Sequence, residues 1–173
     1  MEKMIPVIIP AYEPDMRLLE LLNDMKSNKC GPVILVNDGS GKEYDDIFDK
    51  AQLILKDIGG VLLIHEKNQG KGRALKTAFA YVLEQYPQAI GVVTADSDGH
   101  HTVSCVNAVR FALERQPDNL ILGVRKFDGG NPLEKQIWKY IDRENLCIYY
   151  GRACQRYTDR AQRHSCVVYG RIA

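Results

Sequence analysis

The sequence lacks the features that mark a membrane-spanning, secreted or nucleic-acid-binding protein. No uninterrupted apolar run approaches the length that spans a bilayer. The apolar run that follows Met1 is short and holds two prolines, unlike a signal peptide. The net charge of +1 gives no support for a nucleic-acid partner. Five cysteines, an odd number without C-x-x-C spacing, argue against a disulfide framework or a cysteine metal site. We therefore expect a reduced, cytoplasmic protein.

Short apolar runs alternate with segments of helical periodicity along the first three-quarters of the chain. We expect strands at residues 5–9, 33–36, 61–64, 90–95 and 120–124, with a helix in each interval. Asp15 is the predicted N-cap of the first helix. The apolar faces of the four helices are Leu18, Leu19, Leu22 and Met25; Tyr44, Ile47, Phe48, Ala51 and Leu55; Leu75, Ala78, Phe79, Val82 and Leu83; and Val103, Val106, Val109 and Leu113. This alternation is typical of an α/β domain with a mainly parallel sheet and helices on both faces.

Two carboxylates stand one residue apart directly after the expected strand 90–95. In open parallel sheets, ligands bind beyond the carboxyl ends of the strands, where Asp96 and Asp98 would lie. Carboxylate oxygens suit Mg²⁺ or Mn²⁺ and, through the metal, a phosphorylated ligand. Gly99 lets the chain turn at this point. The alternative is that Asp-x-Asp-Gly is only a turn.

Polar loops also follow the other strands, and we expect them to converge on the same crevice. Asp38 could accept hydrogen bonds from a base or a ribose, or it could cap the following helix. The loop 68–73 offers backbone N–H groups, a helix dipole and the cations Lys71 and Arg73 to an anion. The alternative for this loop is a plain capped turn. Because several polar loops are expected to converge there, we favour a ligand site over a plain turn for Asp96 and Asp98.

Four other residues have weaker functional signals. Tyr12 could flank a base or serve in packing. His100 and His101 have no third ligand at a suitable spacing, so we expect structural or supporting roles for both. Cys105 falls within an expected helix, and we assign it to the core.

Four motifs together resemble a known family. They are Val-Ile-Ile-Pro-Ala-Tyr-Glu-Pro at 7–14, Val-Asn-Asp-Gly-Ser at 36–40, Asn-Gln-Gly-Lys-Gly-Arg-Ala at 68–74 and Ala-Asp-Ser-Asp-Gly-His-His at 95–101. In this order they resemble the family 2 glycosyltransferases, and more narrowly the polyprenyl- and dolichyl-phosphate sugar transferase branch. The resemblance implies a GT-A fold, a Rossmann-like sheet that binds a nucleotide-diphosphate sugar. It also implies an inverting, metal-dependent transfer of the sugar to a polyprenyl phosphate or a glycan.

The resemblance assigns roles to several of the motif residues. It places Mg²⁺ or Mn²⁺ at Asp96 and Asp98, with Asp98 favoured as the direct ligand, and it leaves the catalytic base unassigned. A lipid-phosphate acceptor would bring this cytoplasmic chain to the inner face of the membrane. Glu13 departs from the family pattern, which usually has Asn there. The residues implied in binding the nucleotide sugar are Pro10, Ala11, Tyr12, Glu13, Asp38, Gly70, Lys71, Asp96 and Ser97.

The segment 131–173 does not match the acceptor-side pattern of the family. Its apolar residues keep no sustained period, and we expect a domain at 1–130 followed by an atypical, poorly ordered tail. Codons permitted for Cys154–Ser165, read one nucleotide later, yield Val-Ser-Asp-Thr-Gln-Thr-Gly-Leu-Arg-Gly-Ile-Pro, which is similar to that pattern. Codons permitted for Leu133–Leu146 likewise yield Arg-Ser-Arg-Phe-Gly-Asn. We therefore expect a frameshift near residues 128–132.

Two alternatives to a transferase remain open. If the acceptor-side segment is missing, the chain would bind a nucleotide sugar without transferring it. A sugar-phosphate nucleotidyltransferase shares a related sheet, but its glycine-rich signature should follow the first strand. This chain has Pro10-Ala11-Tyr12-Glu13 at that place, which disfavours a sugar-phosphate nucleotidyltransferase.

Overall fold

A computed structural model describes residues 4–99, 101–117, 121–124 and 165–170. In chain order the elements are β1 (Val7–Ala11), α1 (Met16–Ser27), β2 (Val33–Asn37), the 3₁₀ turn η1 (Lys42–Tyr44), α2 (Asp45–Asp57), β3 (Val61–Ile64), α3 (Lys71–Gln85), β4 (Gly91–Thr94), α4 (Val103–Arg115), β5 (Ile121–Val124) and β6 (Ser165–Gly170). The strands and helices expected from the sequence are therefore confirmed. In the part of the chain that the structure describes, no helix is long and apolar enough to cross a membrane.

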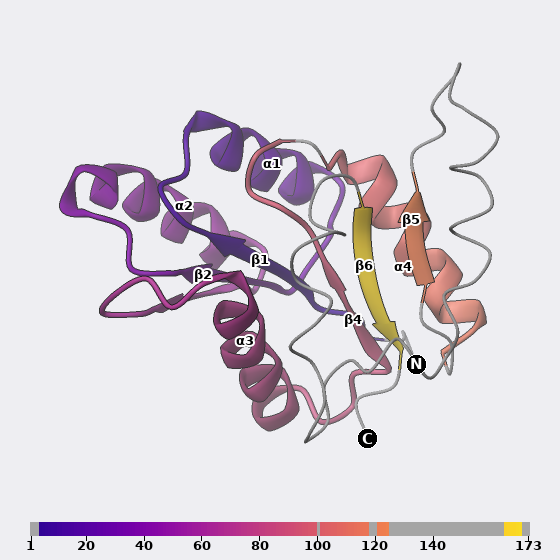
Figure 1. The fold of residues 1–173 in the computed structure, drawn as a ribbon. Coiled ribbons are helices and arrows are strands. Elements are labelled where there is room, and N and C mark those ends of the chain that lie inside the picture. The colour runs from indigo at the N-terminus through magenta and orange to yellow at the C-terminus, as the bar shows by residue number, and fades with distance from the viewer. Residues whose placement is uncertain (1–3, 100, 118–120, 125–164, 171–173) are drawn as a thin grey trace, which may run out of the picture. The chain divides into compact units, whose positions relative to one another are not determined.

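The strands form one sheet in the order β3-β2-β1-β4-β6-β5, shown in Figure 1. β1, β2, β3 and β4 run parallel, and β6 runs antiparallel to β4. From β1 the chain steps outward to β2 and β3, and it then crosses to the other side of β1 to form β4. The strand order therefore reverses beside β1, and such a reversal is the place where ligands bind in open α/β sheets.

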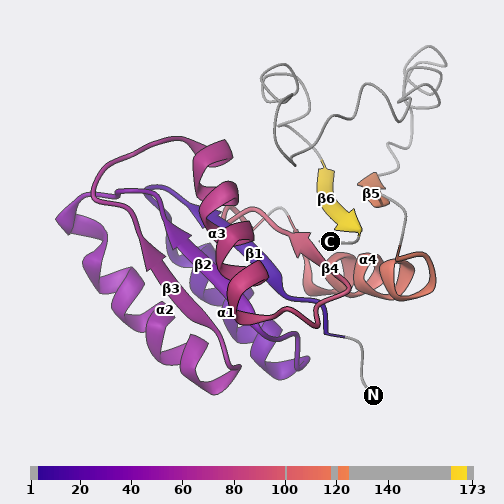
Figure 2. The same ribbon diagram turned by 90° about the horizontal axis from the view of Figure 1, so that it is seen from below.

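Two apolar layers cover the sheet. Alternate residues of a strand point to opposite faces, so Val7 and Ile9 pack with α1, α2 and α4, while Ile8 packs with α3. Figures 1 and 2 show α1 and α2 on one face and α3 on the other. β1 and β2 are buried throughout their lengths, as expected for parallel strands covered on both faces.

Helix α3 packs through smaller residues than its apolar spacing predicts. Its buried residues are Ala74, Ala78 and Val82, a row at four-residue intervals. Small side chains let the helix approach the sheet closely, and Leu83, which the sequence assigns to the same face, is 37% exposed. The assignment of Leu83 to the packed face is wrong, because the row beginning at Ala74 already fills the contact.

The expected boundary at residue 130 remains a prediction. By its internal contacts the chain divides into two units, Met1–Gly123 with Cys166–Ala173, and Val124–Ser165. Of the segment 131–173 the structure describes only β6, and the codon-shifted stretches at 133–146 and 154–165 lie outside the described residues except for Ser165, the first residue of β6.

Candidate functional site

The carboxyl ends of three neighbouring strands lie side by side. Ala11 of β1 pairs with Asn37 of β2, and Asn37 pairs with Ile64 of β3. The loops that follow these strands therefore begin at the same edge of the sheet. β4 joins this edge from the other side of β1, where the last paired residues are Ile8 and Thr94. The loops 10–14, 37–41, 66–73 and 96–101, which we expected to converge, therefore all start from the same edge of the sheet.

Pro10 stands where β1 and β4 cease to pair. The carbonyls of Pro6 and Ile8 accept the N–H groups of Val93 and Ala95, so the even-numbered residues of β1 face β4. Pro10 is the next residue on that side, and proline has no N–H to donate. The ladder from β1 to β4 therefore ends before Pro10, while pairing with β2 continues to Ala11.

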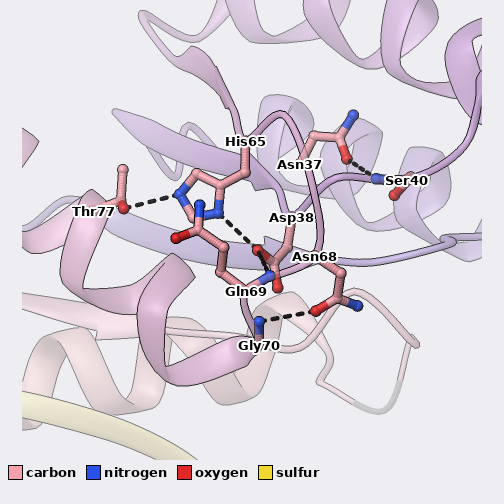
Figure 3. Close-up of polar contacts among 8 residues, drawn as sticks. All are labelled: Asn37, Asp38, Ser40, His65, Asn68, Gln69, Gly70 and Thr77. Atoms are coloured by element: carbon pink, nitrogen blue, oxygen red, sulfur yellow. Dashed lines mark hydrogen bonds and ion pairs between the residues drawn. The ribbon is translucent and has the colours of Figure 1, made fainter.

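Asp38 is buried, and Figure 3 shows its carboxylate facing His65 and Gln69. Its Oδ1 is 2.7 Å from Nδ1 of His65 and accepts the backbone N–H of Gln69 at 3.1 Å. Nε2 of His65 is 2.9 Å from Oγ1 of Thr77 on α3. Asp38 does not cap the following helix, since Gly41 precedes η1 and Tyr44 is the N-cap of α2. The capping alternative for Asp38 is therefore wrong.

Further hydrogen bonds connect the loops after β1 and β2. The N–H of Ser40 donates to Oδ1 of Asn37 at 2.9 Å, and Oγ of Ser40 accepts the N–H of Glu13 at 2.9 Å. Glu13 adopts a φ of 48°, a left-handed conformation in which an L residue is strained. A hydrogen bond to the Glu13 carboxylate raises the pKa of Tyr12, and Asn68 acts in the opposite direction. Tyr12 is 47% exposed, so it is not a core residue.

The pairing of Lys71 with Asp96 brings two predicted site residues together. Lys71 is the first residue of α3, and its Nζ lies 2.5 Å from Oδ1 of Asp96. Both side chains are partly exposed. Nδ1 of the buried His101 accepts the backbone N–H of Asp96 at 2.8 Å, which agrees with the structural role expected for His101. His100 lies outside the described residues.

A second cation lies beside Asp98. The pKa of Arg17 is raised, chiefly by its hydrogen bond to Asp15 and to a smaller extent by the charge of Asp98. A Cβ at Gly99 would come within 3.1 Å of the Arg17 side chain, so this arginine lies along the Asp98–Gly99 turn. Asp15 caps α1 as expected, accepting the N–H of Arg17 at 2.9 Å. The two motif carboxylates therefore lie near Lys71 and Arg17.

The carboxylate pair fits a metal that takes its remaining ligands from a phosphorylated molecule. Within the described ranges, no three His, Cys, Asp or Glu side chains are grouped to hold a metal ion by themselves. Mg²⁺ is commonly bound by one or two carboxylates with waters and substrate phosphates. Asp96 and Asp98 match that donor set. Lys71 already neutralises one oxygen of Asp96, so a metal at this place would compete with the ammonium group.

Sequence reasoning missed several residues that the fold brings to this edge. His65 directly follows β3, Gln69 and Asn68 lie in the next loop, and Thr77 lies at the end of the second turn of α3. The signal available for His65 is its position at the end of an apolar strand, the same signal that identified Asp38 and Asp96. The core assignment of Cys105 is wrong, because this residue is exposed beside Thr102, which caps α4.

This mainly parallel α/β sheet, with polar loops gathered where the strand order reverses, defines an open α/β domain of the Rossmann-like type. The family comparison is more specific. The model of glycosyl transferase family 2 matches residues 7–171, and the chain belongs to that family. The matched range runs through most of the segment 131–173.

Comparisons with individual proteins agree on the fold. The chain is 28% identical over 138 residues to the uncharacterized protein MJ1222 of Methanocaldococcus jannaschii. The aligned region covers 78% of this chain and 53% of that protein. The chain thus spans about half the length of this relative. It is similar to the mannosyltransferase PcManGT from Pyrobaculum calidifontis, solved in complex with GDP-Man and Mn²⁺, with a TM-score of 0.54 and 19% identity over 67% of this chain and 34% of that one.

A second solved structure, 4-diphosphocytidyl-2C-methyl-D-erythritol synthase, matches with a TM-score of 0.53 and 12% identity over 76% of this chain and 68% of that one. At these identities the likeness shows the fold alone. The GT-A type of sheet expected from the motifs is confirmed.

Gly39 allows the Asp38 loop to lie against the loop after β3. Its φ is 71°, and a Cβ there would collide with backbone atoms of Lys67 and Asn68. We expect Gly39→Ala to lower the free energy of unfolding by more than the roughly 1–2 kcal/mol that left-handed strain costs. Urea titration measures this loss. Amide exchange at Gln69 should also become faster, because its N–H reaches Asp38 across the same contact.

Gly59 supplies the matched control. Its φ is 66°, and a Cβ there would have no atom within 4 Å. Gly59→Ala should therefore cost only the strain. Equal losses of stability in the two variants would contradict a packing role for Gly39.

Proposed function

We propose that the chain is a glycosyltransferase that transfers a sugar from a nucleotide-diphosphate sugar, with inversion and with the help of a divalent metal. One observation carries the proposal. In a chain of glycosyl transferase family 2, the Asp38 loop and the pair formed by Lys71 and Asp96 follow strands that end at one edge of the sheet. The proposed acceptor is a polyprenyl phosphate at the inner face of the membrane, or a glycan.

The nucleoside end of the donor is proposed to lie at the loops after β1 and β2. Pro10, Ala11, Tyr12 and Glu13 border it on one side, and Asp38 accepts a hydrogen bond on the other. The exposure of Tyr12 supports this assignment, because its ring is available to stack on a base. Asp38 is already aligned by two donors.

The diphosphate is proposed to lie at the start of α3. Gly70 precedes the helix with a φ of 87°, and no side chain caps the first turn. The helix dipole and the ammonium group of Lys71 favour an anion there. Ser97 and Asp96 border the same place from the loop after β4.

Asp96 and Asp98 would hold Mg²⁺ or Mn²⁺, with Asp98 as the direct ligand. The bound ion supplies positive charge that stabilises the departing nucleoside diphosphate. The chain's own part is to hold both carboxylates near that charge. His101 fixes the backbone of Asp96 for this purpose.

The second candidate is a chain that binds the donor without transferring its sugar. The site residues assigned above come from residues 10–98, while the segment 131–173, where the acceptor-side pattern was expected, lies mostly outside the described residues. General base catalysis alone contributes about 10²–10⁴-fold. A frameshifted tail would remove that contribution and leave the donor site intact.

The two candidates differ in turnover. We expect the 173-residue chain to transfer radiolabel from one member of a panel of nucleotide sugars to a polyprenyl phosphate, in the presence of Mn²⁺ or Mg²⁺. Extraction of the labelled lipid measures the transfer, and a reaction without acceptor is the control. Saturable donor binding without turnover would favour the second candidate. A chain that neither binds nor transfers any donor would contradict both.

Asp98→Asn tests the metal assignment. The substitution removes a charged oxygen ligand but keeps the side-chain size, so the fold should survive. We expect metal-dependent affinity for a nucleoside diphosphate to fall by about 100-fold or more, since even residues that support metal ligands contribute about 10–100-fold. Calorimetry with and without Mn²⁺ measures this. Asp57→Asn, which breaks a surface ion pair with Lys26, is the control. Unchanged metal-dependent affinity in folded Asp98→Asn would refute the assignment.

Lys71→Ala separates the diphosphate from the nucleoside. We expect affinity for a nucleoside diphosphate to fall by about tenfold, the usual scale for a hydrogen bond to a charged group, with little change for the free nucleoside. Competition titration with both ligands measures the difference. Lys50→Ala, which removes an ammonium group paired with Asp46 on α2, should change neither affinity. Equal losses for the two ligands would indicate a structural role for Lys71.

A further inference from the structure

Lys71 and Asp96 form an ion pair that is less exposed than the surface pairs of the chain. The Nζ of Lys71 lies 2.5 Å from Oδ1 of Asp96, and the two side chains are 38% and 26% exposed. Three pairs on α1 and α2 have side chains that are 48% to 86% exposed. Water and salt screen a partly buried pair less than a surface pair. One oxygen of the proposed metal ligand Asp96 is therefore held by a cation of the protein itself.

The sheet holds Asp96 in place, whereas the side chain of Lys71 can move. The backbone N–H of Asp96 donates to Nδ1 of the buried His101 at 2.8 Å. The N–H of the preceding residue, Ala95, donates to the carbonyl of Ile8 in β1 at 2.9 Å. Lys71 begins α3 and carries its charge on a flexible four-carbon stem. The pair can therefore open by rotation of the lysine side chain, without a change in the backbone.

Opening of this pair couples the binding of a metal to the binding of a diphosphate. A bare divalent cation at Asp96 would displace Lys71 and leave the ammonium group beside a second positive charge, which repels it. A diphosphate at the start of α3 would give the displaced ammonium group a new partner. Both ligands thus favour the open pair, and the pair opens only once when they bind together. Two ligands that favour the same state bind cooperatively.

We propose that Lys71 is a specificity-determining residue that keeps a bare divalent cation off Asp96 and admits the cation together with a nucleoside diphosphate. This inference rests on the proposed function, which places both ligands at this edge of the sheet. It adds a second task for Lys71, which is to serve as the counter-ion of Asp96 until a diphosphate takes its ammonium group. The same side chain therefore weakens the binding of the metal alone and strengthens the binding of the nucleotide with its metal.

Substitutions of Lys71 separate these two effects by their sign. Lys71→Met and Lys71→Gln keep much of the length of the side chain and remove its charge, so Asp96 loses its counter-ion. Lys71→Arg keeps a cation that can pair with a carboxylate. Lys67→Gln removes an exposed charge from the loop that leads to α3, and it is the control for a general change in charge. A purely structural role of Lys71 predicts weaker binding of every ligand in both uncharged variants.

The experiment measures the binding of Mn²⁺ alone, and of UDP and GDP with and without Mn²⁺, to the full chain and its variants. Electron paramagnetic resonance of free Mn²⁺ gives the first affinity, and calorimetry gives the others. We expect Lys71→Met and Lys71→Gln to bind Mn²⁺ alone about tenfold more tightly than the wild-type chain, the usual scale for a hydrogen bond between charged groups. Lys71→Arg should bind Mn²⁺ alone as weakly as wild type. Lys67→Gln should stay within about threefold of wild type, because exposed charges interact weakly.

The nucleotide titrations should show the opposite sign. In saturating Mn²⁺, Lys71→Met and Lys71→Gln should bind the preferred nucleotide about tenfold less tightly than wild type, because the contact of the ammonium group with the diphosphate is lost. Without metal their nucleotide affinity should change little, because that loss is offset by the loss of a pair that had to open. The gain in nucleotide affinity that Mn²⁺ produces should therefore be about tenfold smaller in these variants.

The outcomes distinguish this inference from the proposed function. If the folded uncharged variants bind Mn²⁺ alone no more tightly than wild type, or if Lys67→Gln shows the same gain, the role of Lys71 is overturned. The glycosyltransferase proposal then stands, provided that the wild-type chain binds a nucleotide with Mn²⁺. A wild-type chain that binds neither nucleotide under any of these conditions would overturn the proposed function and this inference with it. Thermal unfolding shows whether each variant is folded, and the second uncharged variant decides the matter if one of them is not.

Discussion

The missing N–H of Pro10 is the constraint on which the site depends. β1 pairs with β2 through its odd-numbered residues and with β4 through its even-numbered ones, so a proline at position 10 interrupts only the β4 side. The pairing of β1 with β4 therefore ends before the edge where the strand order reverses. Loops from β1, β2 and β4 can then present side chains to a ligand at that edge without breaking the pairing that holds the core.

Carboxylates gather at this edge, and the fold supplies a partner for each of them. Asp38 receives hydrogen bonds from His65 and Gln69, Asp96 is paired with Lys71, and Asp98 lies near Arg17. The partners come from different elements, so no short stretch of sequence contains both members of a pair. A nucleotide with its metal, as proposed, would meet two carboxylates, Asp96 and Asp98, that already lie near the cations Lys71 and Arg17. Binding would then replace contacts within the protein, such as the pair of Lys71 with Asp96, by contacts of the same side chains with the ligand and its metal.

Much of the fold could be predicted because periodicity records which face of an element is buried. Val103, Val106, Val109 and Leu113 are all buried, as their spacing predicts. The prediction was wrong where a neighbour decides the outcome. Leu83 and Cys105 have the spacing or the character of core residues, but Ala74 and Ala78 fill the contact of one helix, and Cys105 faces outward beside a capping threonine. Side-chain burial depends on the partner surface, which local spacing does not record.

The sequence by itself determined the order of strands and helices as far as β5, the family and the loops that bear chemistry, because each of these depends on patterns within a few residues; β6, in the expected tail, was not predicted. Only the tertiary structure decided which side chains meet across those loops. It turned Asp38 away from the helix cap toward His65, joined Lys71 to Asp96, and placed Thr77 behind the histidine ring. These contacts join residues that are 12 to 27 positions apart. Their formation depends on the register of neighbouring strands and the packing of α3, which are properties of the assembled sheet.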